Sequence, residues 1–459
     1  MTELALREEQ ATAHIHGICL KTGPPARVGV ELEWLVRDAA DPAAPVPAER
    51  IAAATAVFEP GVPPPRGAPG TARPDPVPDP VRPDSAPSLP SSSSPGLLPS
   101  GAFLTSEPGG QLELSSLPAD SLPALVSATR ADLAVLRAAV AAEGLELAGI
   151  GHDPFRPPLR VLGLPRYTAM EKFFDRRGRW GRLMMCGTAS VQVCLDAGDD
   201  SGAPTGYSYR WRLLHAVGPV LVAAFANSPL RDGRPTGWRS SRQQVWAHMD
   251  ADRTRPPRVN GTDPRSAWAA YALDAQVMCV PSDSPDWTAP AGLTFRDWLR
   301  GSAAEPRPAG PDDIDYHLST LFPPVRPRGH LEIRMIDAQP GDGWIVPLAV
   351  TTALLSDGRA GDAALAAAER IWPGSPGDWP AAPGAPDQGG ADGNPWLSAA
   401  RRGPADPAIA RASRECFDAA RDALARMNVP ETITGPVDAF TDKYVARGRC
   451  PADDLLEVM

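Results

Sequence analysis

Residues 27–36 read RVGVELEWLV, and their alternation is typical of a β-strand. One face carries apolar side chains, namely Val28, Val30, Leu32 and Trp34. Glu31 and Glu33 both fall on the opposite face, about 7 Å apart. Two like charges on one face repel each other unless a cation lies between them. The alternative is an edge strand with one solvated face, which is common in antiparallel sheets.

Other segments repeat this pattern of a polar face opposite an apolar one. Residues 111–115 (QLELS) follow the turn Gly109-Gly110 and place Glu113 on a polar face, whereas residues 330–337 (HLEIRMID) place Glu332 and Arg334 together. Residues 183–196 are expected to form a further strand, with an uncharged polar face made of Thr188, Ser190, Gln192 and Cys194. The pattern predicts an α+β fold, with a mainly antiparallel sheet that is packed on helices by one face and open on the other.

The charge balance of that open face predicts a metal site. If the polar faces converge, the carboxylates share one surface with too few cationic side chains, and several of their pKa values should rise. All-oxygen ligands favour Mg²⁺, or Mn²⁺, over zinc. The residues alone therefore predict a metal-dependent cleft, with a merely solvated sheet face as the alternative.

The chain is expected to form a single domain over residues 1–459, because the sheet uses strands from about residue 28 to residue 336. Helices are expected over residues 3–20, 48–58, 121–143, 209–226, 240–249, 344–355, 407–427 and 436–447. Residues 59–100 are rich in Pro, Ser and Asp and are expected to be a disordered insertion, and residues 374–394 a Pro/Gly-rich loop.

Composition excludes several classes of function. The net charge of −10 argues against a nucleic-acid or anionic-membrane binder, whose affinity rests on clustered Lys and Arg. The six cysteines show no C-x-x-C spacing, and no apolar run is long enough to span a bilayer. We therefore expect a cytoplasmic protein with free thiols. Neither a G-x-x-x-x-G-K-[ST] phosphate loop nor a G-x-S-x-G nucleophile motif is present. The sequence specifies no oligomeric state.

The ordered set of these segments resembles the glutamate–cysteine ligase family, in the branch shared by plant and many bacterial enzymes, and most nearly its actinobacterial members that serve ergothioneine synthesis. The matching segments are residues 29–33 (GVELE), 107–115 (EPGGQLELS), 166–167 (RY), 184–196, 225–229 (FANSP), Arg242 with Trp246, 271–274 (YALD) and 331–334 (LEIR). The insertion at residues 59–100 departs from the compact family pattern.

The resemblance implies a catalytic fold like that of glutamine synthetase and the guanidino kinases, in which a curved antiparallel sheet forms a funnel backed by helices. It also implies the reaction: ATP phosphorylates the γ-carboxylate of L-glutamate, and the amine of L-cysteine attacks the acyl phosphate. Because two anions must meet, Mg²⁺ is expected to screen them. Two alternatives stay open, another carboxylate–amine ligase with a different acceptor and a non-catalytic ligand-binding relative.

The resemblance also implies roles for individual residues. Its metal ligands would be Glu31, Glu33, Glu113 and Glu332, with Glu107 as a further candidate. Arg334 would bind the ATP triphosphate and act in catalysis, since a fixed guanidinium suits phosphate. The substrate-binding set would be Arg166, Arg242, Trp246, Thr188 and Gln192. For Thr188 and Gln192 the alternative is a structural role, and for each arginine a solvated surface charge.

Overall fold

The fold is organised around one open, antiparallel sheet. The computed structural model describes residues 6–58, 96–257, 262–302, 306–372 and 394–458, which form an eight-stranded sheet in the order β2-β3-β4-β1-β6-β10-β9, with β5 paired to β1. Every pairing between these strands is antiparallel, so the expected fold class is confirmed. The strands are β1 (Val28–Asp38), β2 (Gly96–Leu97), β3 (Phe103–Ser106), β4 (Leu112–Ser115), β5 (Leu145–Ala148), β6 (Ser190–Asp196), β9 (Val325–Pro327) and β10 (His330–Asp337). A separate hairpin joins β7 (Leu230–Arg231) and β8 (Arg234–Pro235).

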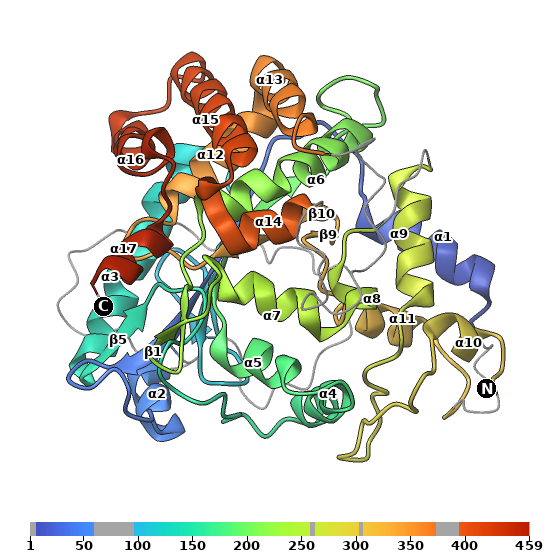
Figure 1. Ribbon diagram of the computed structural model, residues 1–459. Helices are drawn as coiled ribbons and strands as arrows, with labels where there is room; N and C mark the ends of the chain where they lie inside the picture. Colours follow the sequence, from blue (N-terminus) through green and yellow to red (C-terminus); the bar gives the residue numbers. More distant parts are fainter. Residues whose placement is uncertain (1–5, 59–95, 258–261, 303–305, 373–393, 459) are drawn as a thin grey trace.

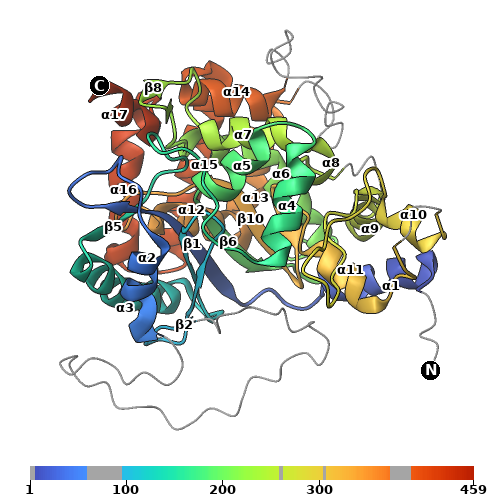
Figure 2. The same ribbon diagram turned by 90° about the horizontal axis from the view of Figure 1, so that it is seen from below.

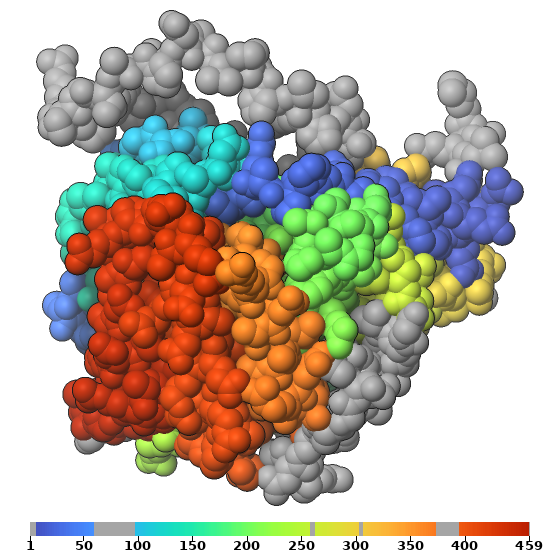
Figure 3. Space-filling view, turned by 90° about the horizontal axis from the view of Figure 1, so that it is seen from above, coloured from blue at the N-terminus to red at the C-terminus, as the bar shows by residue number. Residues whose placement is uncertain are grey.

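The apolar face of the sheet packs on a large helical layer. Its main helices are α3 (Leu122–Ala142), α6 (Tyr207–Ala224), α12 (Ile345–Ser356), α13 (Gly358–Glu369), α15 (Pro407–Arg426) and α16 (Glu431–Lys443). In α12 every residue except Ser356 is buried, because helices cover it on several sides as well as the sheet. One apolar core joins these helices to β1, β6 and β10. Figure 3 shows the C-terminal segment, in orange and red, as one continuous outer surface beside the green middle of the chain.

A second group of helices lies away from that layer. It consists of α4 (Pro165–Asp175), α5 (Trp180–Gly187) and α7 (Ser241–Met249), which share a separate apolar cluster. Figure 1 shows these three helices grouped together, apart from α12, α13 and α15. A third cluster joins α1 (Glu8–Cys19), α9 (Pro264–Asp274), α10 (Phe295–Leu299) and α11 (Pro311–Leu318), which lie at one end of the molecule in Figures 1 and 2. The other helices are α2 (Ala48–Thr55), α8 (Ala251–Thr254), α14 (Pro395–Arg402) and α17 (Pro451–Glu457).

One expected strand begins later than the sequence pattern indicated. Residues 183–187 belong to helix α5, and β6 starts only at Ser190. The residues LMMC have apolar side chains at both helical and strand spacing, and Leu and Met, which are not branched at Cβ, favour the helix. Thr188 is the C-cap of α5, and its hydroxyl donates to the Met184 carbonyl (2.7 Å). The prediction that Thr188 shares a strand face with Gln192 is therefore wrong.

The expected disordered insertion (residues 59–100) and the expected Pro/Gly-rich loop (residues 374–394) fall mostly outside the described residues. Residues 59–95 and 373–393 belong to the part that the structure leaves undescribed. At the end of the first segment the expected bound needs correction, because Gly96–Leu97 pairs with β3. Asn394, the last residue of the second segment, is the N-cap of α14. No helix within the described ranges is long and apolar enough to cross a membrane.

Candidate active site

Three of the predicted acids meet on one face of the sheet. Strand register places Glu33 directly opposite Glu113 of β4, and Glu31 directly opposite Gln192 of β6. Because directly opposed residues point to the same face, these side chains project together. The prediction that the first strand and the strand at Glu113 share a polar face is confirmed.

The carboxylate of Glu33 is held in place by its neighbour strand. Ser190 Oγ donates to one oxygen (2.9 Å) and Gln192 Nε2 to the other (2.8 Å). The amide oxygen of Gln192 in turn accepts from Arg334 Nη1. A continuous hydrogen-bonded chain therefore links Glu33, Gln192 and Arg334 across β1, β6 and β10.

Glu107 reaches the same region from a tight turn. The amide of Glu107 donates to the Gln111 carbonyl (2.8 Å), and the Gly110 amide donates back to the Glu107 carbonyl (2.8 Å). A Cβ on Gly109 would lie 2.5 Å from the backbone of Cys186, so only glycine lets this turn approach α5 so closely. The side-chain amide of Gln111 fixes the turn by donating to the carbonyls of Met185 (3.2 Å) and Thr188 (3.0 Å).

These acids repel one another at partly buried positions. Burial, followed by the charge of Glu332, raises the pKa of Glu31 to about 7. Burial, followed by the charge of Glu33, raises the pKa of Glu107 to about 7. The pKa of Glu113 also rises well above its usual range, through burial and then through Glu31 and Glu107. The predicted excess of negative charge on this face is thus present.

The donor set suits a hard divalent cation. Glu31, Glu33, Glu107 and Glu113 offer oxygen ligands only, and a cation would relieve the repulsion that contributes to the raised pKa values of Glu31, Glu107 and Glu113. Neighbouring hydroxyls of Thr105 (3.3 Å) and Ser115 (3.2 Å) donate to Glu113 and orient it. Among the described residues, no three Asp, Glu, His or Cys side chains already stand close enough together to hold one ion.

Glu332 differs from the other four acids. Its side chain is fully buried, and its two oxygens accept from Arg326 Nε and Nη2 (both 2.8 Å), with Arg334 Nη1 as a third donor. Burial by itself would raise the pKa of Glu332, but Arg326 and Arg334 outweigh burial and hold the pKa well below its usual range. Sequence reasoning missed Arg326, although an arginine between Val325 and Pro327 in a short apolar segment was a usable signal.

The predicted substrate-binding residues lie in different surroundings. Gln192 lies on the acidic face, whereas the hydroxyl of Thr188 is used by helix α5. Arg166 donates to the hydroxyl and carbonyl of Ser319 (both 3.0 Å) and lies 5.1 Å from the centre of the Tyr316 ring.

Arg242 and Trp246 come from successive turns of α7. Arg242 is buried, donates from Nη2 to the Arg334 carbonyl (2.8 Å) and lies 5.5 Å from the centre of the Trp246 ring. Its Nε and Nη1 have no hydrogen-bond partner among the residues that the structure describes. Trp246 packs edge-on against Phe322.

Comparison with known proteins assigns the chain to a family. Residues 27–459 match Glutamate-cysteine ligase family 2 (GCS2). The chain belongs to this family. The resemblance inferred from the sequence segments is confirmed, and this member of GCS2 is a ligase.

Individual relatives agree with this assignment. The chain is 41% identical over 361 residues to "Glutamate--cysteine ligase EgtA" of Mycobacterium tuberculosis, covering 77% of this chain and 76% of the relative. It is 38% identical over 457 residues to the protein of the same name from Mycolicibacterium smegmatis, covering 96% and 92%. A chloroplastic glutamate–cysteine ligase of Medicago truncatula is 32% identical over 249 residues, covering 52% and 47%.

A solved structure shares the fold. The glutamate–cysteine ligase of Francisella tularensis, crystallised in complex with AMP, superposes with a TM-score of 0.53 at 10% identity, covering 95% of this chain and 85% of that one. At this identity the likeness concerns the fold alone.

Proposed function

We propose that this GCS2 ligase joins the γ-carboxylate of L-glutamate to the amine of L-cysteine on the acidic face of the sheet, with ATP as the energy source. The observation that carries the proposal is the convergence of Glu31, Glu33, Glu107 and Glu113 beside Arg334 in a glutamate–cysteine ligase chain. The product would feed ergothioneine synthesis, as the resemblance implies.

The reaction runs in two displacements. A γ-carboxylate oxygen of glutamate attacks the γ-phosphorus of ATP, and the bond from that phosphorus to ADP breaks. The cysteine nitrogen, as the free amine, then attacks the acyl carbon of the γ-glutamyl phosphate. Inorganic phosphate leaves with the electrons of the broken C–O bond, and the nitrogen releases one proton to solvent. Phosphate leaves far more readily than oxide would leave an unactivated carboxylate. Both displacements depend on positioning and charge stabilisation, so no protein nucleophile is required.

The acids are the groups that would hold the metal. Glu31, Glu33, Glu107 and Glu113 would bind Mg²⁺, with Mn²⁺ as the other ion suited to oxygen ligands. When bound, the ion would screen the triphosphate from the substrate carboxylate. Glu332 would join this set only by sharing an oxygen with the guanidinium groups that already contact it.

Arg334 is the group that would meet developing charge on the phosphoryl oxygens. Gln192 and Glu332 fix its guanidinium between the acids and the buried Arg326. A pre-oriented guanidinium stabilises charge without reorganising during the reaction. Arg242 would bind a substrate carboxylate through Nε, which has no hydrogen-bond partner among the described residues, while its Nη1 lies 4.0 Å from Asp337. Arg166 would first have to leave Ser319.

The location of the protein follows from its thiols and its substrate. All six cysteines lie in the described residues as free thiols. A reducing compartment keeps both these thiols and the substrate cysteine reduced. We therefore place the reaction in the cytoplasm.

A coupled assay tests the proposal. ADP release would be measured with ATP, Mg²⁺, glutamate and a panel of amines, and the mass of the product would be determined by mass spectrometry. We expect turnover to be fastest with L-cysteine and the product mass to equal glutamate plus cysteine minus water. Equal rates with other amines would refute the choice of cysteine and favour another carboxylate–amine ligase. No ADP release with any amine would refute the reaction.

A further inference from the structure

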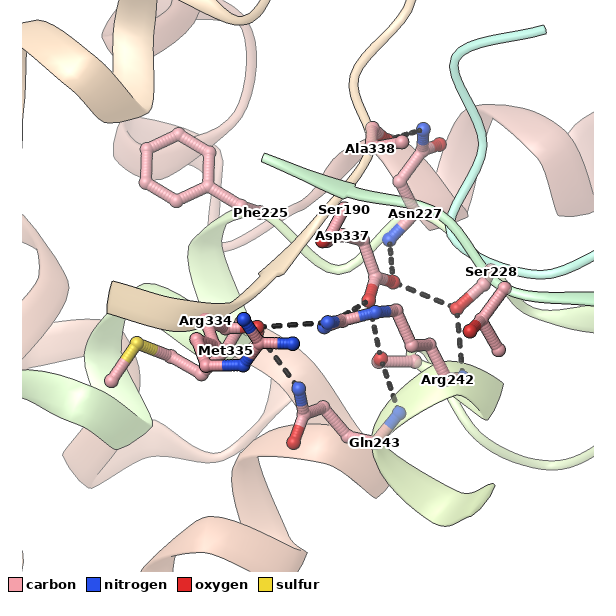
Figure 4. Close-up of polar contacts among 12 residues, drawn as sticks. Ser190, Phe225, Asn227, Ser228, Arg242, Gln243, Arg334, Met335, Asp337 and Ala338 are labelled. Atoms are coloured by element: carbon pink, nitrogen blue, oxygen red, sulfur yellow. Dashed lines mark hydrogen bonds and ion pairs between the residues drawn. The ribbon is translucent and has the colours of Figure 1, made fainter. Parts of the chain in front are cut away.

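Asp337, at the end of β10, is the hub of a buried polar network (Figure 4). One oxygen accepts from the Asn227 amide (2.9 Å) and from Ser228 Oγ (2.7 Å). The other oxygen accepts from Ser240 Oγ (2.9 Å). The Asp337 side chain is only 1% exposed, and Arg242 Nη1 is 4.0 Å from its nearer oxygen. Asp337 is therefore held chiefly by donors from two loops, one before β7 and one before α7.

Both loops fix the first turn of α7. Ser240 is the N-cap of this helix, and its Oγ accepts from the Gln243 amide (3.1 Å) while it donates to Asp337. Ser228 Oγ similarly accepts from the Arg242 amide (3.2 Å) while it donates to Asp337. Each hydroxyl thus connects the Asp337 carboxylate directly to the backbone at the start of α7.

The first turn of α7 in turn holds an irregular part of β10. The register between β10 and β6 shifts between Ile333 and Ile336, so Arg334 and Met335 form a bulge. Their carbonyls leave the regular ladder and accept from α7 side chains: Arg242 Nη2 donates to Arg334 (2.8 Å) and Gln243 Nε2 donates to Met335 (2.9 Å). A bulge re-aims the side chains that it carries, and here it carries Arg334.

Close packing leaves Asp337 little freedom. A Cβ on Gly151 would lie 2.4 Å from Cγ of Asp337, so the adjacent backbone approaches the carboxylate as closely as glycine permits. The Gly151 amide donates to the Asn227 carbonyl (3.1 Å), so the loop before β7 is hydrogen-bonded to the backbone segment that packs against Asp337. The carboxylate therefore has one position available, set by backbone on both sides.

We propose that Asp337 is a positioning residue for Arg334: through Ser228, Ser240 and the first turn of α7, it holds the bulge that aims the Arg334 guanidinium at the acidic face. Asp337 itself touches no substrate in this scheme. The inference rests on the proposed function, in which Arg334 meets the phosphoryl group.

The test compares two buried aspartates. Asp337→Asn replaces one acceptor with an N–H donor that faces the donors of Ser228 and Asn227. Asp132→Asn is the matched control, because Asp132 is equally buried, has a pKa that burial raises, and accepts from the Ser100 amide (2.7 Å) at helix α3. We expect D337N to lower kcat at least tenfold, and D132N to change kcat less than twofold. Equal effects of the two substitutions would overturn the proposal.

A double-mutant cycle separates positioning from general damage. If Asp337 acts through Arg334, D337N should lower kcat in the wild-type background but have little further effect in an Arg334→Ala background. The same fold-loss in both backgrounds would overturn the proposal. Should D337N fail to fold, Ser240→Ala removes a single donor to Asp337 and is tested in the same two backgrounds, with a three- to tenfold loss expected only where Arg334 is present. Wild-type ADP release with glutamate and cysteine is measured first, so that failure of the proposed function is recognised separately.

Discussion

In two neighbouring parts of one sheet face, the pKa values of glutamate side chains are shifted in opposite directions. Glu31, Glu107 and Glu113 lie in one region and form no ion pair with another described residue, and their pKa values are raised. Glu332, on the next strand but one from β1, is paired with two guanidinium groups, and its pKa is lowered. The difference shows that one part of the face carries more negative than positive charge, and this is the part where the proposed function places the metal ion and the nucleotide. The other part already contains its cations and holds them rigid.

The largest expected effect on activity comes from replacing Glu33, one of the proposed metal ligands. Glu33→Gln keeps the shape of the side chain and removes the charge, so we expect ADP release to fall at least about 10³-fold, as for loss of a group that directly stabilises the transition state. The fold should persist, because removing a like charge relieves repulsion. Circular dichroism and ADP release would be measured together. Glu146→Gln, on an exposed position of β5, is the control. Near-normal activity of the Glu33→Gln variant would contradict the metal assignment.

Glu332→Gln should act mainly on stability. The substitution leaves the buried Arg326 without its counter-ion, and breaking a buried pair in this way costs about 3–5 kcal/mol. Glu113→Gln is the matched substitution in the other part of the face, and we expect it to leave the free energy of unfolding unchanged or higher. Urea unfolding at pH 8 without divalent metal measures both. Equal destabilisation by the two substitutions would remove the contrast between the two parts of the face.

In the metal-free protein, the free energy of unfolding should depend on pH in one range through Glu31 and Glu107 and in another range through Glu332. Glu31 and Glu107 have a pKa of about 7, against 4.5 ordinarily, so the folded state keeps their protons to higher pH than the unfolded chain. Their contribution to the free energy of unfolding therefore falls as pH rises from about 4.5 to 7, by on the order of 3 kcal/mol per group. Glu332 has a lowered pKa, so its contribution is present above pH 4.5 and is lost as pH falls below that value.

Urea unfolding between pH 3 and pH 8 separates these contributions by substitution. The Glu31→Gln/Glu107→Gln variant should decline less steeply than the wild type between pH 4.5 and 7, because Glu113 alone remains of the three acids with a raised pKa. Glu332→Gln should lose part of the decline at acid pH. A double variant that declines as steeply as the wild type between pH 4.5 and 7 would show that these acids do not carry raised pKa values.

The smallest expected effect is stabilisation by the metal itself. Mg²⁺ that binds only the folded state raises the melting temperature, by about 1–4 °C at tenfold to hundredfold excess over its dissociation constant. We expect this rise at pH 8 in the wild type and in Glu146→Gln, and its absence in Glu31→Gln/Glu113→Gln. Differential scanning fluorimetry with NaCl at matched ionic strength as the reference measures it. An undiminished rise in the double variant would place the metal elsewhere.

The local pattern of the chain was sufficient for much of the fold and of the site. Alternation in residues 27–36 predicted β1, and helical spacing of apolar residues predicted a helix over residues 121–143, which is α3. The antiparallel sheet and the shared face of Glu31, Glu33 and Glu113 followed from the two-residue period of strands. Thr188 was misplaced, because a short apolar run fits a helix and a strand equally well.

What the sequence by itself determined is which residues share a face, because strand and helix periods are local properties of the chain. Only the tertiary structure decided which charges meet. Arg326 pairs with Glu332 through a β9–β10 register, and Asp337 joins Asn227, Ser228 and Ser240 from segments about 100 residues away in the chain. Such contacts depend on how distant elements pack. The bulge in β10, which carries Arg334 and re-aims its side chain, cannot be predicted from the periodicity of the strand.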